Sequence, residues 1–244
     1  MKITQLKGRQ KRESQQIVKL SVLMEKMKIE SEEQPVSNLR HSLQYVSRST
    51  HCMAVDKLPK LSFAAEFKKV DAQQEMIRYN GVVLLEIDGL AGIEEAEAVR
   101  DEVARLPHTL AAFVGSGGKS VKWLVSFIRP DGSLPQAKAE AELFHAQAYR
   151  KAVRFYEELI SYKVTLKRPS LNHYCRFSYD PGLFFNHEAH PILMKQPCEV
   201  STEPDRECAI PDENASLLTL MPGHQYRSVV SALFASALQA VYEE

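Results

Sequence analysis

The sequence predicts an α+β protein in which helices pack on a mixed or mostly antiparallel sheet. The apolar run Val82–Asp88 has a glycine on each side, which is typical of a buried strand. Two further apolar runs, Thr109–Val114 and Ser120–Ile128, flank a glycine turn and predict a β-hairpin. Between them and the first strand, Ile93–Leu106 carries one apolar stripe at helical spacing and predicts an amphipathic helix.

The remaining elements follow from the same patterns. Met1–Leu6 fits a short strand, whereas the apolar spacing over Glu13–Ile29 and Val36–Ser49 favours two helices. The proline in Lys57–Phe63 disfavours a helix, so this stretch predicts a turn that leads into an extended segment. The pattern over Ala137–Tyr162 predicts the longest helix of the chain.

Four segments are expected along the chain. Residues 1–34 form a polar N-terminal segment, and residues 35–200 form the α+β core. Residues 201–222, which contain three prolines, are predicted to form a linker, and residues 223–244 a C-terminal helical segment. Because this last helix runs almost to the final residue, we expect further domains in a longer chain.

Composition describes an ordinary globular protein. Of the 244 residues, 44% are hydrophobic and 25% charged, and the formal net charge is zero, which argues against a histone-like binder. The polar N-terminus predicts no signal peptide, and no apolar run is long enough to span a membrane. The four cysteines form no CxxC pair, so a reduced, cytoplasmic setting is expected. Zinc is not expected, because His187, His190, Cys198 and Cys208 match no standard spacing.

Two carboxylates end the strand Val82–Asp88. Side chains two apart on a strand share a face, so Glu86 and Asp88 point the same way. Two carboxylates at the edge of a core repel each other unless a cation lies between them, and hard oxygen ligands suit Mg²⁺ or Mn²⁺. In the alternative, Glu86 faces solvent and Asp88 caps the helix that follows.

A glycine-rich turn precedes the strand Ser120–Ile128. Its exposed N–H groups can form an anion-binding nest, with Ser116 and Lys119 in the turn and Ser120 and Lys122 on one strand face. The lysines would supply positive charge for phosphate. In the alternative, this is a plain glycine hairpin with solvated lysines.

A third polar cluster lies at 176–180. If residues 175–179 form a strand, Arg176, Ser178 and Asp180 share one face. Asp180 would then add a third carboxylate to a metal site, and Arg176 could bind a phosphate bidentately. In the alternative, an Arg–Asp ion pair ends the strand and the next residues form a simple turn.

Together, the three clusters resemble the VirE N-terminal domain family, which is similar to the catalytic core of archaeo-eukaryotic primases and primase-polymerases. The resemblance covers roughly residues 35–200. The primase pattern has an Asp-x-Asp strand, a Ser-x-His strand after a glycine turn, and a later strand that ends in Asp. Here these motifs correspond to Glu86 and Asp88, to Ser120 and Lys122, and to Asp180.

The resemblance implies nucleotidyl transfer in a replication or mobile-element context, with a nucleoside triphosphate and nucleic acid as partners. It implies Mg²⁺ or Mn²⁺ held by catalytic Glu86, Asp88 and Asp180. Together with the local patterns described above, it gives Ser116, Lys119, Ser120, Lys122 and Arg176 as the predicted phosphate-binding residues. Two departures, Glu86 for aspartate and Lys122 for histidine, leave an alternative open. This alternative is a catalytically degenerate module that binds single-stranded nucleic acid, or an interaction module, within a larger protein.

Overall fold

The computed structural model has an α+β architecture with mostly antiparallel sheets, and its described part contains four helices. The residues it describes are 1–7, 14–43, 55, 57–70 and 73–194. The predicted linker and C-terminal helix lie outside these residues, as does the end of the helix predicted from Val36 to Ser49. None of the described helices is long and apolar enough to cross a membrane.

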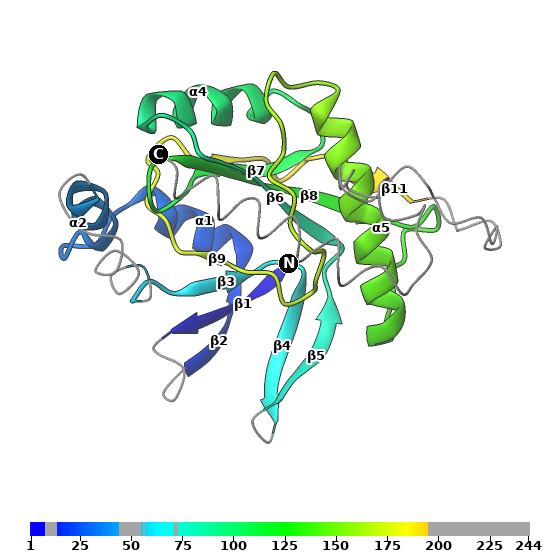
Figure 1. The fold of residues 1–244 in the computed structure, drawn as a ribbon. Helices are drawn as coiled ribbons and strands as arrows, with labels where there is room; N and C mark the ends of the chain where they lie inside the picture. The colour runs from blue at the N-terminus through cyan, green and yellow to red at the C-terminus, as the bar shows by residue number, and fades with distance from the viewer. Residues whose placement is uncertain (8–13, 44–54, 56, 71–72, 195–244) are drawn as a thin grey trace, which may run out of the picture. The chain divides into compact units, whose positions relative to one another are not determined.

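The main sheet contains the three strands that the apolar runs predicted (Figure 1). β8 lies between β7 on one edge and β6 on the other, and both pairs are antiparallel. Two short strands extend the sheet, β10 beside β7 and β11 parallel to β8. The strand bounds are β6 Val82–Asp88, β7 Thr109–Val114, β8 Ser120–Ile128, β10 Phe184–Phe185 and β11 Ile192–Leu193.

Helices cover both faces of this sheet. α4 (Ile93–Ala104) and α5 (Lys138–Glu157) pack on one face, where alternate residues of β6 and β8, such as Leu85 and Trp123, enter the same core. The opposite face packs against α1 (Leu20–Lys28) in a second core. Strand alternation therefore assigns each residue of β6 and β8 to one of two layers.

A second sheet lies beside α1 in Figure 1 and has the order β2–β1–β3–β9. Its strands are β1 Lys2–Lys7, β2 Ser14–Lys19, β3 Lys60–Ser62 and β9 Cys175–Arg176. A separate hairpin joins β4 (Ala65–Val70) to β5 (Gln73–Tyr79), and α2 spans Pro35–Ser42. Because β1 pairs with β3, the start of the chain is hydrogen-bonded to the segment predicted as the core.

Two predicted elements differ in type or extent, and β4, β5, β10 and β11 were not predicted. The helix predicted over Glu13–Ile29 is wrong in its first part, because residues 14–19 form β2 and pair in register with β1; only Leu20–Lys28 is helical. The strand predicted at 175–179 covers only Cys175–Arg176. In both cases pairing with a distant strand decides the local structure, which periodicity alone does not show.

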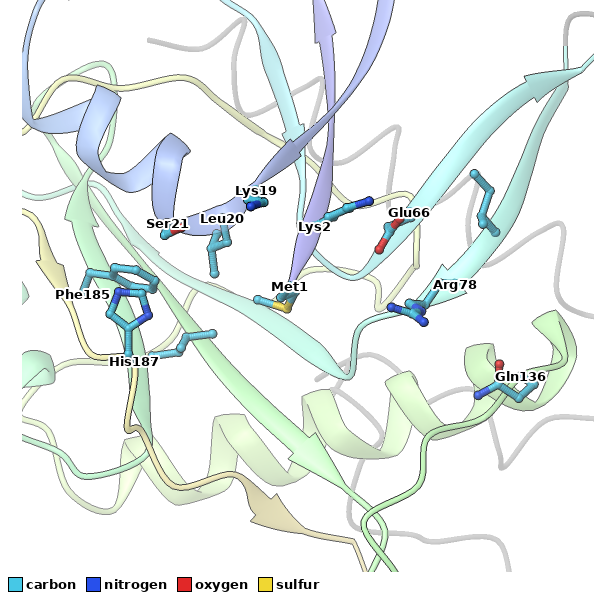
Figure 2. Close-up of a pocket in the computed structure, with 12 residues that line it drawn as sticks. Met1, Lys2, Lys19, Leu20, Ser21, Glu66, Arg78, Gln136, Phe185 and His187 are labelled. Atoms are coloured by element: carbon cyan, nitrogen blue, oxygen red, sulfur yellow. The ribbon is translucent and has the colours of Figure 1, made fainter.

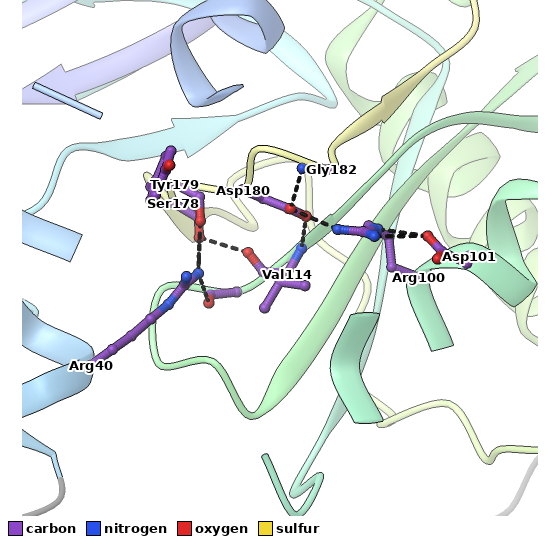
Figure 3. A network of polar contacts seen from close by, with 9 residues as sticks. Arg40, Arg100, Asp101, Val114, Ser178, Tyr179, Asp180 and Gly182 are labelled. Carbon is purple, nitrogen blue, oxygen red and sulfur yellow. Dashed lines mark hydrogen bonds and ion pairs between the residues drawn. The ribbon is translucent and has the colours of Figure 1, made fainter. Parts of the chain in front are cut away.

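A buried ion pair fixes the loop that follows β9 (Figure 3). Asp180 Oδ1 lies 2.7 Å from Arg100 Nη1 on α4, and the two residues are 1% and 7% exposed. The backbone N–H groups of Val114 and Gly182 also donate to the Asp180 carboxylate, at 2.8 and 2.9 Å. Position 182 needs glycine, since a Cβ there would overlap the Arg100 guanidinium.

Arg40 of α2 extends this network to the glycine turn (Figure 3). Its Nη2 donates to the carbonyl oxygens of Tyr179, at 2.7 Å, and Gly115, at 3.2 Å. Ser178 Oγ in turn donates to the carbonyl of Val114 at 2.6 Å. The loop at 178–182, the end of β7 and α2 therefore share one set of polar contacts.

We predict that Asp180→Ala destabilises the fold by about 3–5 kcal/mol, because it removes the buried carboxylate that accepts from Arg100 Nη1 and from the N–H of Val114. The matched control is Asp101→Ala. Asp101 Oδ1 lies 2.8 Å from Arg100 Nη2, but its side chain is 57% exposed, so the expected loss is below about 1 kcal/mol. Urea denaturation followed by circular dichroism measures both. Equal losses would contradict a dominant role for the buried pair.

Candidate functional site

The strand register brings the first two polar motifs opposite each other. On β6 and β8, Glu86 pairs with Lys122 and Asp88 with Ser120. By alternation all four side chains lie on the α1 face of the sheet, where Leu84 packs into the second core. Glu86 is only 5% exposed, so it does not face solvent.

A lysine from a distant loop completes this cluster. Lys167 Nζ lies 2.9 Å from Glu86 Oε1 and 3.3 Å from Asp88 Oδ2, while Lys122 forms an ion pair with Glu86 Oε2. Both carboxylates therefore converge on one ammonium group. Two carboxylates face two ammonium groups, so the cluster is formally neutral. The ammonium group of Lys167 lies between the two carboxylates, at the position for which the sequence predicted a divalent metal ion.

Backbone contacts hold the Lys167 loop against the end of β6. The N–H of Thr165 donates to the carbonyl of Glu86 at 2.8 Å, and the N–H of Asp88 donates to Thr165 Oγ1 at 2.8 Å. The N–H of Lys167 donates to the hydroxyl of Tyr149, on α5, at 2.8 Å. Asp88 does not cap α4, because the N-cap of that helix is Gly92, without a side-chain cap.

The charges of the cluster shift the pKa values of its members. Burial alone would raise the pKa of Glu86, but the ammonium groups of Lys122 and Lys167 lower it below its usual value. The hydrogen bond to Glu86 raises the pKa of Lys167. Burial lowers the pKa of His173, and the field of Glu86 opposes that change. His173 therefore belongs to the electrostatic surroundings of the cluster.

The glycine turn next to the cluster is tightly built. The N–H of Gly115 donates to the carbonyl of Ser120 at 2.8 Å, and a Cβ at position 115 would overlap Ser120 Oγ. Gly118 has φ +74°, which favours glycine. Ser116 is half-buried and Lys119 is exposed. The backbone carbonyl of Lys119 accepts a hydrogen bond from the N–H of Leu90 at 3.0 Å.

The remaining predicted site residues form their contacts outside the Glu86–Asp88 cluster. Asp180 is held by Arg100 at the edge of β7, and Arg176 Nη1 donates to the carbonyl of Leu58 at 3.1 Å. Among the residues that the structure describes, no group of three or more His, Cys, Asp or Glu side chains is placed to hold a metal ion. Glu86 and Asp88 are thus a two-carboxylate set. Cys198 and Cys208, from the disfavoured zinc set, lie outside the described residues.

Sequence reasoning did not place Thr165, Lys167 or His173 in the site. They reach the cluster from a loop that lies 77 to 87 positions further along the chain, and no local periodicity marks a residue in such a loop. One feature of the sequence could have pointed to them. Two carboxylates on a buried strand need cations to compensate their charge, and Lys167 is one of the basic residues that could supply one.

The family comparison agrees with a domain built around these strands. The model of the BT4734-like N-terminal domain matches residues 53–185, which is more than half of the chain. The chain belongs to this family. The matched region runs from just before β3 to β10 and contains Glu86, Asp88, Lys122 and Lys167. No curated protein and no solved structure matches the chain.

The lowered pKa of Glu86 predicts a specific dependence of stability on pH. A carboxyl group whose pKa is lower in the folded state stabilises the protein above its unfolded value, here 4.5, and loses that contribution as the pH falls through the folded pKa. The difference in unfolding free energy between the wild type and Glu86→Gln should therefore be constant above about pH 4.5 and shrink below it. Urea denaturation of both proteins at a series of pH values between about 3 and 7 measures this difference. A difference that grows on acidification would contradict the ion pairs.

Proposed function

We propose that the domain binds a nucleoside triphosphate together with Mg²⁺ or Mn²⁺ at the Glu86–Asp88 cluster and acts on nucleic acid by nucleotidyl transfer. One observation carries the proposal: both carboxylates point at a single cation position, which the ammonium group of Lys167 fills. The resemblance of the motifs to primase-polymerases supports the same reaction class.

The donor set suits a hard divalent cation. Glu86 and Asp88 offer carboxylate oxygens, which Mg²⁺ and Mn²⁺ prefer. The side chains of Asp88 and Lys167 are both 41% exposed, so Lys167 can leave without opening the core. When bound there, a divalent cation would neutralise charge on the triphosphate oxygens and act as a Lewis acid.

The two lysines then have a second role. When a cation takes their place between the carboxylates, the ammonium groups of Lys122 and Lys167 lose their partners and can bind phosphate oxygens. Ser120 lies beside Asp88 on the neighbouring strand, and the glycine turn leads directly into it. A divalent cation would balance the charge of the two carboxylates, and the two released ammonium groups would neutralise part of the charge of the triphosphate.

A second candidate is a nucleic-acid-binding module without catalysis. The observation that favours it is Asp180, whose carboxylate is buried and satisfied by Arg100 and two N–H groups. A two-metal reaction holds its ions about 3.5–4 Å apart with shared acidic ligands, and the cluster contributes only two carboxylates.

We predict opposite effects for two substitutions in the cluster. Asp88→Asn should lower Mn²⁺ affinity at least tenfold, because it removes an anionic ligand. Lys167→Met should raise the affinity for Mn²⁺ alone, because it removes the competing ammonium group, and should weaken binding of the Mn²⁺–triphosphate pair. Isothermal titration calorimetry with MnCl₂, with and without ATP, separates these effects.

Asp101→Asn, an exposed carboxylate on α4, is the matched control for loss of a negative charge. Mn²⁺ binding that is unchanged in Asp88→Asn would rule out the cluster as the metal site. Primer synthesis and extension with Mn²⁺ then separate the two candidates. Metal and triphosphate binding without any product would select the non-catalytic module.

A further inference from the structure

A polar groove lies at the end of the main sheet opposite the Glu86–Asp88 cluster (Figure 2). It has a volume of about 760 Å³ and is lined mainly by the start of β1, the junction of β2 and α1, the β4–β5 hairpin, and β10 with the segment after it. Its charged and aromatic lining residues are Lys2, Lys19, Glu66, Arg78, Phe185 and His187.

The groove concentrates positive charge. Lys2 and Lys19 are directly opposite each other in the β1–β2 pair, an arrangement of like charges that destabilises a sheet. Arg78 lines the same groove from β5, where it is directly opposite Glu66 of β4, which is the one carboxylate among the lining residues. In the described part of the chain, no ion pair within 4 Å joins Lys2, Lys19 or Arg78 to a carboxylate. A bound polyanion would relieve this repulsion.

Two aromatic rings form the opposite side of the groove in Figure 2. The ring centroids of Phe185 and His187 are 4.3 Å apart, with an interplanar angle of 60°. Phe185 is half-buried and packs against the second core, so it is held in place, whereas His187 is exposed. The exposed side chain of Ile77 adds apolar surface to the lining.

We infer that this groove binds a single strand of nucleic acid, with Lys2, Lys19 and Arg78 on the phosphates and the Phe185–His187 pair stacked on a base. Cations on several strands suit a chain of phosphates better than one phosphate. Aromatic faces stack on bases that are free of a partner strand, which selects single strands over duplex. The inference rests on the proposed function for its class of ligand.

The groove and the Glu86–Asp88 cluster are separate binding regions. The cluster lies at the carboxyl end of β6, whereas Arg78 of the groove lies shortly before β6 begins. The length of β6, on the order of 20 Å, separates them. Groove variants can therefore be tested without changing the cluster.

The experiment measures fluorescence anisotropy of a labelled oligothymidylate, about twelve nucleotides long, in a titration with salt. Lys2→Gln/Lys19→Gln should weaken binding at least tenfold and reduce the slope of log affinity against log salt by about 1.4, or 0.7 for each phosphate contact. Phe185→Leu, which keeps the apolar packing, and His187→Ala should each weaken binding about fivefold or more. The control is Lys138→Gln, an exposed lysine of α5.

Thermal melting of each variant reports its folding, and calorimetry with Mn²⁺ and ATP reports the cluster. Oligonucleotide binding that falls equally in Lys138→Gln, or that duplex or polyglutamate competes away as well as single strands do, would overturn the inference. Triphosphate binding without any oligonucleotide binding would overturn it and leave the proposed function standing. Groove-dependent oligonucleotide binding without triphosphate binding would support the groove and refute the proposed triphosphate site.

Discussion

The buried ion pair between Arg100 and Asp180 connects the layers of the fold. Arg100 comes from α4 on one face of the main sheet, and the Asp180 carboxylate also accepts the N–H of Val114 at the end of β7. The backbone N–H of Asp180 donates to the carbonyl of Met27, in α1 on the opposite face, at 2.8 Å. One residue thus touches both helical layers and the sheet between them. An uncompensated charge at that point would be costly, so the surrounding loop has little freedom to move.

This arrangement divides the acidic residues into two kinds. Asp180 is 1% exposed and fully satisfied, so its charge stabilises the fold and is not available to a ligand without large rearrangement. Asp88, in contrast, has a side chain that is 41% exposed, and its partner Lys167 is exposed to the same extent. Exposed ion pairs contribute little to stability and exchange partners readily. The weakly held pair at Asp88 is therefore the one suited to binding.

Local sequence patterns predicted the elements whose structure depends on neighbouring residues in the chain. The three long strands of the main sheet, the glycine turn and the helix that begins at Ile93 follow from periodicity and turn chemistry, and alternation placed Glu86 and Asp88 on one face. Pairing between distant segments was not predictable in this way, which is why residues 14–19 were assigned to a helix. The same limit applies to the site. Alternation identified the carboxylates and their need for a cation, but only the folded loop shows that Lys167 supplies it.

Although the formal net charge of the chain is zero, the Glu86–Asp88 cluster and the groove differ in their local charge. The Glu86–Asp88 cluster balances two carboxylates with two ammonium groups, so it exerts little attraction at distances beyond the screening length. The groove sets three cations against one carboxylate and attracts polyanions. A neutral cluster favours a ligand that brings both a cation and an anion, whereas a basic groove favours a continuous chain of phosphates. Binding of the two ligands should therefore differ in salt dependence, since only the groove releases counterions from a polyanion.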